Sequence, residues 1–151
     1  MNRRDLITSL SALALAPAAE SQPLPNPSDP ILGTPRVFLY EDLPTRKNPN
    51  GSESRQVTQG TFLTGEYVSI HESTIPVGAT PNPLHQHRPS DILLIREGTV
   101  AFEHDGKSEK VGPGGVILAT SMTAHTIRNI GNIPARYFVI GVSHESPKQL
   151  V

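Results

Sequence analysis

Cysteine is absent from the 151-residue chain. Its absence excludes disulfide bonds, thiolate nucleophiles and the cysteine-based zinc and iron–sulfur sites. Any metal bound by this protein must therefore be held by histidine and carboxylate side chains.

An excess of charge of either sign is also absent. The 13 basic and 14 acidic side chains leave a formal net charge of -1. Such a balance gives no indication of the basic tail or patch that binds nucleic acid or a membrane surface. We therefore expect a small-molecule ligand or substrate and no nucleic-acid partner.

Chain-breaking residues, in contrast, are abundant. The 15 prolines and 12 glycines are too many for a helical bundle and are typical of short strands joined by turns. A chain of 151 residues fits one domain with one core. We expect a single all-β domain.

The first 18 residues have the pattern of an export signal. The basic pair Arg3-Arg4 precedes a short apolar run, and Ala16-Pro17-Ala18 supplies small residues for cleavage. The basic pair and the two apolar residues that follow Asp5 resemble the twin-arginine export motif. We expect residues 1–18 to be a signal peptide, so that the mature protein is exported, periplasmic or extracellular, and has no membrane anchor after cleavage. An amphipathic N-terminal helix that stays attached is the alternative.

Residues 19–56 are expected to form a proline-rich arm and a loop. Prolines at 23, 25, 27, 30 and 35 favour an extended, stiff chain. Residues 37–40 are a short strand candidate, and the polar stretch 46–56, which contains Asn50-Gly51, is expected to be a surface loop.

Residues 57–151 are expected to form the barrel. Short β-branched or apolar runs alternate there with turn residues, and Asp105-Gly106 is a strong hairpin signal. Strands are expected near 62–63, 67–75, 91–96, 99–104, 116–119, 125–130 and 135–142.

Four side chains of this region form a candidate metal site. His85 and His87 are two residues apart, so both imidazoles point to one face of an extended segment. Asp91 has the same parity, and His125 begins another expected strand. In a closed β structure these side chains could converge on one divalent transition-metal ion, namely Fe, Mn, Ni, Cu or Zn.

The spacing around these residues resembles a known pattern. His85-x-His87-x3-Asp91-x6-Gly98 is similar to the first cupin motif, G(x)5HxH(x)3-4E(x)6G, with Gly78 near its opening glycine. Six residues separate Gly78 from His85 instead of five, and Asp91 stands where the family usually has glutamate.

The second cupin motif, G(x)5PxG(x)2H(x)3N, is matched more loosely. Gly114 is eleven residues before His125, the spacing His125-x3-Asn129 closes the motif, and the usual proline and glycine between them are missing. The resemblance spans residues 78–142 and implies a single cupin jelly-roll β-barrel with a metal near the middle of one end.

The resemblance leaves the occupancy and ligands of the site open. Many cupins lack a metal, so the alternative is a barrel in which the metal site has decayed. Asp91 either ligates the ion directly, binds it through water, or acts only as a hydrogen-bond acceptor or base beside it. Asn129 is expected to be a hydrogen-bonding residue of a turn or strand end. His71, His104 and His144 are expected to lie at the surface.

Strand parity also predicts part of a substrate pocket. If Asp91 faces the cavity, Leu93 and Ile95 do so too, and Ile127 shares the face of His125. This wall is apolar and carries no Lys or Arg. The alternative is that these three residues are ordinary packing inside the barrel.

Two functions from different classes fit these features. One is a mononuclear metal-dependent oxygenase that acts on a small organic substrate. The other is a non-catalytic metal- or small-ligand-binding cupin of the cell envelope. A histidine-based isomerase is less favoured because the expected cavity lacks cationic side chains.

A homodimer is also expected. Ile92 and Leu94 point away from the cavity, so the strand that carries them needs a second cover. Cupins commonly pair through sheet faces and exchanged N-terminal strands, and the segment 37–40 is the one we expect to cross over.

Overall fold

The computed structural model describes residues 30–144. The expected signal peptide, 1–18, and most of the proline-rich stretch lie outside the described residues. The described chain is almost entirely β-structure, with one short 3-10 helix, η1 (Tyr40–Asp42). The expected all-β class is confirmed.

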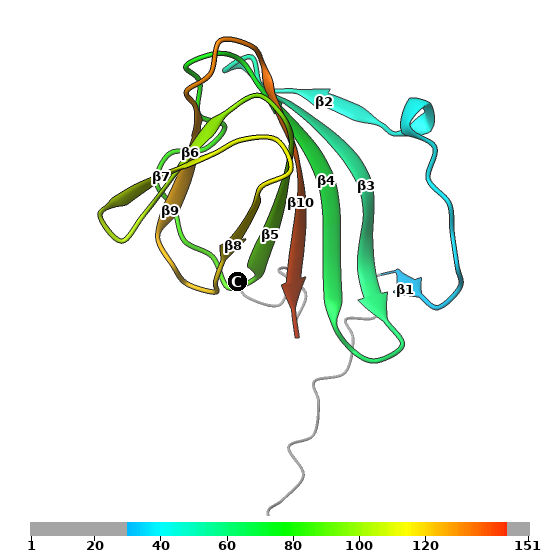
Figure 1. Cartoon of the computed structure of the whole chain (residues 1–151). Helices are drawn as coiled ribbons and strands as arrows, with labels where there is room; N and C mark the ends of the chain where they lie inside the picture. The colour runs from blue at the N-terminus through cyan, green and yellow to red at the C-terminus, as the bar shows by residue number, and fades with distance from the viewer. Residues whose placement is uncertain (1–29, 145–151) are drawn as a thin grey trace, which may run out of the picture.

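Two sheets make up the domain (Figure 1). The large sheet has the order β1-β3-β4-β10-β5-β8, with β2 paired to β3, and the small sheet has the order β7-β6-β9. The strands of the large sheet are β1 (Ile31–Leu32), β2 (Thr45–Lys47), β3 (Glu53–Phe62), β4 (Tyr67–Ile75), β5 (Ser90–Glu97), β8 (Val116–Ala119) and β10 (Ala135–Ser143). Those of the small sheet are β6 (Val100–His104), β7 (Lys107–Val111) and β9 (His125–Asn129).

The last strand, β10, holds the centre of the large sheet. It pairs antiparallel with β4 on one side and with β5 on the other. Its alternating residues Ala135, Tyr137 and Val139 are buried and belong to the core between the sheets. The period-two pattern thus places one face of β10 inside.

Two turns agree with their sequence signals. Asp105 and Gly106 have φ of 47° and 73°, the left-handed values that a two-residue turn between β6 and β7 requires. Asn129 is buried, and its side-chain amide donates hydrogen bonds to the carbonyl oxygens of Ile75 and Ile133. Asn129 is therefore a structural hydrogen-bonding residue, as expected.

The N-terminal part of the described chain differs from expectation. Residues 37–39 lie outside any strand, and Tyr40 begins η1, so the expected strand at 37–40 is wrong. The expected loop at 46–56 is wrong too, because β2 and the start of β3 form an antiparallel hairpin around the turn at Gly51. Polar residues form these strands because backbone pairing, and not burial of one face, holds them.

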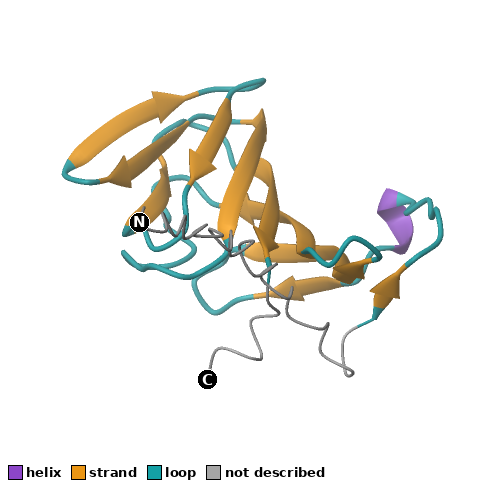
Figure 2. Cartoon of the chain, turned by 90° about the horizontal axis from the view of Figure 1, so that it is seen from below, coloured by secondary structure: helices purple, strands orange, loops and turns teal. Residues whose placement is uncertain are grey.

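Arginine side chains attach η1 to the large sheet. The Arg55 guanidinium lies 4.3 Å from the ring centroid of Tyr40 and donates hydrogen bonds to the carbonyl oxygens of Tyr40 and Leu43. The neighbouring Arg96 donates to the buried carboxylate of Glu72 at 2.6 Å. Figure 2 shows η1 at one edge of the molecule.

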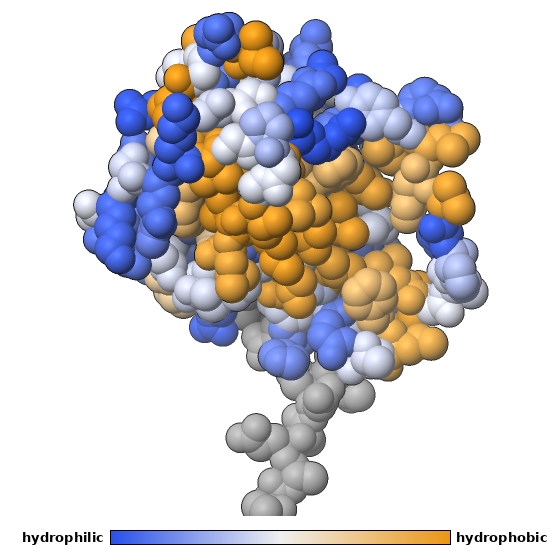
Figure 3. All heavy atoms as spheres, in the orientation of Figure 1, coloured by the Kyte–Doolittle hydropathy of each residue, from blue (hydrophilic) through white to orange (hydrophobic). Residues whose placement is uncertain are grey.

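The outer face of the large sheet is apolar and uncovered in the single described chain. Ile92 is half-buried, and Leu94 and Leu118 are 37% and 62% exposed. Hydrophobic side chains gather over the middle of this sheet in Figure 3. The expected cover of β5 on this side is not supplied within residues 30–144.

Candidate metal centre

Backbone pairing brings two of the predicted ligands together. The amide of His125 donates to the carbonyl of His85 at 2.8 Å, and the amide of His85 donates to the carbonyl of His125 at 3.1 Å. Residues that exchange both hydrogen bonds in an antiparallel pair carry their side chains on one face. The loop before β5 is thereby fastened to the start of β9, with both imidazoles on the same side.

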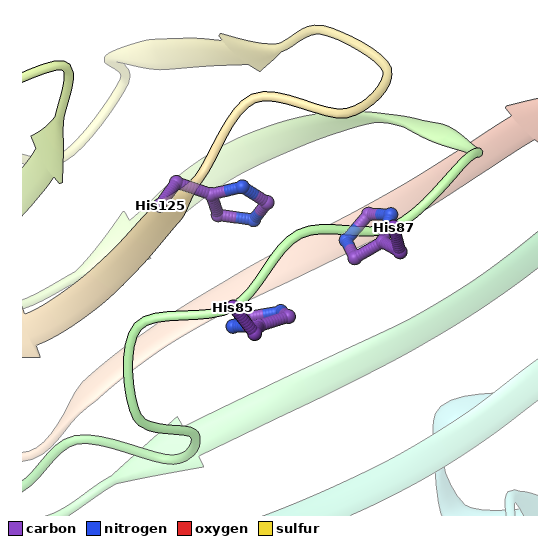
Figure 4. A group of neighbouring side chains, drawn as sticks. All are labelled: His85, His87 and His125. Atoms are coloured by element: carbon purple, nitrogen blue, oxygen red, sulfur yellow. The ribbon is translucent and has the colours of Figure 1, made fainter.

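His87 completes a group of three. The ligand nitrogens of His85, His87 and His125 lie within 4.8 Å of one another, and Figure 4 shows the three rings gathered around one space. Bonds between imidazole nitrogen and zinc are about 2.0–2.1 Å long. Two nitrogens bound to one ion lie at most about 4.2 Å apart, so nitrogens as far apart as 4.8 Å would move slightly inward to share an ion.

The outer nitrogen of each ring is held by a backbone carbonyl. His85 Nδ1 lies 2.9 Å from Pro83 O, His87 Nδ1 lies 3.0 Å from Pro89 O, and His125 Nδ1 lies 2.8 Å from Thr123 O. A carbonyl only accepts hydrogen bonds, so each Nδ1 carries the proton. In that tautomer the lone pair is on Nε2, where it is available to a metal ion.

Asp91 contacts one member of the group. Its Oδ2 lies 3.2 Å from His87 Nε2, although Asp91 is not part of the mutually close set of three in the described chain. A carboxylate that faces the lone pair of a neutral imidazole is unfavourable unless a proton or a cation lies between them. Three imidazoles with a neighbouring carboxylate are a donor set that suits a divalent transition ion.

A cavity of about 260 Å³ opens beside the three histidines. Leu93 and Ile127 lie on its wall, with Phe102 and Val139. Ile95, which was predicted to line the pocket, is instead buried in the core between the sheets. Ile95 lies on the same face of β5 as Leu93, as expected, but it is farther along the strand and does not reach the cavity.

Sequence reasoning missed four polar residues of the same cavity, His71, Ser73, Asn82 and Tyr137. The expectation that His71 lies at the surface is wrong. Burial lowers the pKa of His71, and the Asp91 carboxylate partly offsets this effect. Burial also raises the pKa of Tyr137, which is 2% exposed, although a hydrogen bond with Ser73 acts in the opposite direction. The alternation of His71 and Ser73 with the buried Ile75 was the available signal.

The remaining histidines lie apart from the group. His104 lies 2.7 Å from the Glu109 carboxylate, which raises the pKa of His104 together with Asp105. His144 is exposed and lines a larger, more open depression of about 540 Å³. None of the three grouped histidines lines that depression, so we place the site in the smaller cavity.

Comparison with known proteins now identifies the family. Residues 71–141 match the family described as Cupin domain. The chain is also 31% identical over 98 residues to the uncharacterized protein MJ1618 of Methanocaldococcus jannaschii, an alignment that covers 64% of this chain and 78% of that protein. Residues 71–141 of the chain thus form a cupin domain.

Solved structures share the fold of this cupin. An RmlC-like cupin from Shewanella frigidimarina has a TM-score of 0.63 and 14% identity, over 78% of this chain and 97% of the other. A predicted oxalate decarboxylase from Thermotoga maritima has a TM-score of 0.56 and 20% identity, over 71% and 98%. The polyketide cyclase RemF from Streptomyces resistomycificus has a TM-score of 0.57 and 16% identity, over 72% and 80%. The expected cupin jelly roll is confirmed, and the varied descriptions of these proteins leave the reaction open.

The described residues include no helix that is long and apolar enough to cross a membrane.

Proposed function

We propose that this cupin binds one divalent transition-metal ion through His85, His87 and His125 and acts as a mononuclear oxygenase on a small organic molecule. The observation that carries the proposal is the gathering of one ring nitrogen from each of three histidines beside a cavity, with each ring oriented by a backbone carbonyl. Three protein ligands leave coordination positions open, as catalytic sites require.

The ligand side chains indicate a class of metal ion and do not select one particular ion. Imidazole ligands suit Fe, Mn, Ni, Cu and Zn, and the carboxylate of Asp91 suits the harder ions of this group. A redox-active ion would supply the electron transfer that oxidation by O₂ needs. The chain itself would orient the ligands, hold the substrate and keep bulk water from the cavity.

The apolar wall of the cavity would keep bulk water away from a bound substrate. Leu93, Phe102 and Ile127 are each less than a tenth exposed and line the cavity next to the histidines. They limit the water that can surround a bound substrate, so polar contacts inside are stronger than they would be in solution.

A second candidate function is a non-catalytic metal- or small-ligand-binding cupin of the cell envelope. The observation that favours it is the 3.2 Å contact between Asp91 and His87. A short shift of this carboxylate would supply a fourth ligand and close the coordination of a zinc ion.

One experiment separates the two. The protein is purified without added metal, its metal content is measured, and oxygen uptake is followed with a panel of phenolic and diketone compounds. About one open-shell ion per chain with compound-dependent uptake supports the oxygenase. A bound four-coordinate zinc without uptake supports the binding protein, and a chain that takes up no divalent transition ion contradicts both.

We also propose that the protein acts outside the cytoplasm. The proposal rests on the Arg3-Arg4 pair, the apolar run and the small residues up to Ala18. Twin-arginine systems carry folded cargo, so the ion would be loaded before export.

We propose further that the mature protein is a homodimer. The apolar outer face of the large sheet and the exposed segment 37–39 lie on the same chain, and Val37 is 87% exposed. A second copy supplies a matching apolar face, because a two-fold axis places one patch against its own equivalent. In the described chain η1 contacts its own β3 through Arg55, so any exchange involves the segment before Tyr40.

A further inference from the structure

A polar wall lies on the inner face of the large sheet, in the same cavity as the three histidines. His71 and Ser73 are two residues apart on β4, and Tyr137 is the direct partner of Ser73 on β10. Directly paired residues of neighbouring strands carry their side chains on the same face. Strand register therefore gathers polar groups on this part of the inner face.

The phenol of Tyr137 is buried and protonated. The residue is 2% exposed, burial raises its pKa, and its phenol interacts with the Ser73 hydroxyl. A buried phenol that stays neutral is a hydrogen-bond donor for an uncharged acceptor.

The rest of the lining sets limits on the ligand. Among the described residues that line this cavity there is no Lys or Arg, whereas Asp91 contributes negative charge. An anionic group away from the metal would thus lose its hydration without gaining a cationic partner. The cavity volume of about 260 Å³ is just below the range of roughly 300–1,000 Å³ that is usual for small-molecule sites, which restricts the ligand to a compact molecule.

We propose that the cavity selects a compact, uncharged molecule with an apolar body and two oxygen functions, one directed at the three histidines and the other bound by the Tyr137 hydroxyl. This proposal rests on the proposed function in placing the ligand beside the metal-binding histidines. Tyr137 acts in it as a specificity-determining residue, and Leu93 and Ile127 contact the apolar body.

The test compares matched probes that bind to the purified protein, whose metal content is measured in the same sample. Resorcinol has two hydroxyl groups on an apolar ring, and phenol has one. We expect resorcinol to bind about tenfold more tightly than phenol in NMR titrations, since one hydrogen bond to a buried donor has about that effect. In the Tyr137→Phe variant this preference falls to about one. Tyr40→Phe, which removes the hydroxyl of an exposed tyrosine outside the cavity, keeps the tenfold preference.

The effect of ligand charge is tested on the unaltered protein, so this second experiment remains valid even if Tyr137→Phe does not fold. The probes are 3-hydroxybenzenesulfonate and 3-(methylsulfonyl)phenol, which have similar size but differ in charge. We expect the uncharged sulfone to bind at least tenfold more tightly than the sulfonate.

Three results overturn the proposal: no binding of resorcinol at millimolar concentration, an unchanged preference in Tyr137→Phe, or equal binding of the charged and uncharged probes. Any of these in a sample that retains its metal contradicts only the ligand assignment. A sample that takes up no metal contradicts the proposed function instead.

Discussion

The carboxylate of Asp91 lies against the backbone of Gly141, its direct partner on β10. Its Oδ1 is 3.1 Å from the position that a Cβ atom at residue 141 would occupy, while its Oδ2 is 3.2 Å from His87 Nε2. The missing side chain of Gly141 therefore leaves the space in which this acid approaches His87 of the three grouped histidines.

The space beside Gly141 lets us predict the effect of a longer acidic side chain at residue 91. We expect Asp91→Glu, which restores the usual cupin residue, to keep or improve metal binding because the longer side chain reaches further toward the ion. In a Gly141→Ala background the same change should lower metal content severalfold, since the added methyl group crowds the carboxylate. Metal analysis of the purified variants checks both results. A large loss of metal in Asp91→Glu alone would mean that the cavity is shaped around the shorter side chain.

Loss of the imidazoles should remove the ion. We expect His85→Ala, His87→Ala and His125→Ala each to lower metal occupancy more than tenfold, because two remaining imidazoles hold a divalent ion weakly. His104→Ala and His144→Ala are the matched controls and should leave occupancy unchanged. Unchanged metal content in the double variant His85→Ala, His87→Ala contradicts the site assignment.

Two histidines should titrate in opposite directions from the ordinary value of about 6.5. The Glu109 carboxylate raises the pKa of His104, whereas burial lowers that of His71. The pairing of His104 thus stabilises the fold below its unfolded pKa, and this effect is lost as the pH rises through the folded value. Burial of neutral His71 has the reverse effect, since it disfavours the fold as the pH falls below its unfolded pKa.

An NMR pH titration of the two imidazoles measures both shifts. We expect Glu109→Gln to return the pKa of His104 toward its ordinary value and to leave His71 where it was. If His104 titrates at or below the ordinary value in the unaltered protein, the hydrogen bond to Glu109 is not formed in solution.

Charge on the apolar outer face should dissociate the dimer. Leu94→Glu and Leu118→Glu each place a charge in the apolar face of both copies, and we expect each to weaken association by about tenfold or more because the buried charge lacks a partner. Deletion of the residues up to Tyr40 should weaken association too. Ile133→Glu, at an exposed turn, is the control and should have no effect. A monomer mass from light scattering at micromolar concentration, with the arm intact, would refute the homodimer.

Export should depend on the basic pair. Replacement of both Arg3 and Arg4 by lysine is expected to leave the precursor inside the cell, because twin-arginine systems discriminate between these two cations. Cell fractionation with an antibody against the protein gives the readout. Normal export of this variant would indicate the general secretory route.

Much of the barrel follows from local sequence. Short apolar or β-branched runs bounded by turn residues predict the strands around Tyr67, Leu93 and Val139, and Asp105-Gly106 predicts its hairpin. These signals depend only on neighbours in the chain. The hairpin of β2 and β3 was missed because its polar residues are held by backbone pairing with a partner that lacks an apolar pattern.

By itself, the sequence determined the fold class and which side chains are available to bind a metal. The spacing of His85 and His87 placed two imidazoles on one face, since alternation along an extended chain is a local property. Only the tertiary structure decided that His125 pairs with His85, that Asp91 leans over Gly141, and that His71 and Tyr137 share the cavity. These relationships depend on the register between strands distant in sequence, which is set by packing of the whole barrel and not by any local pattern.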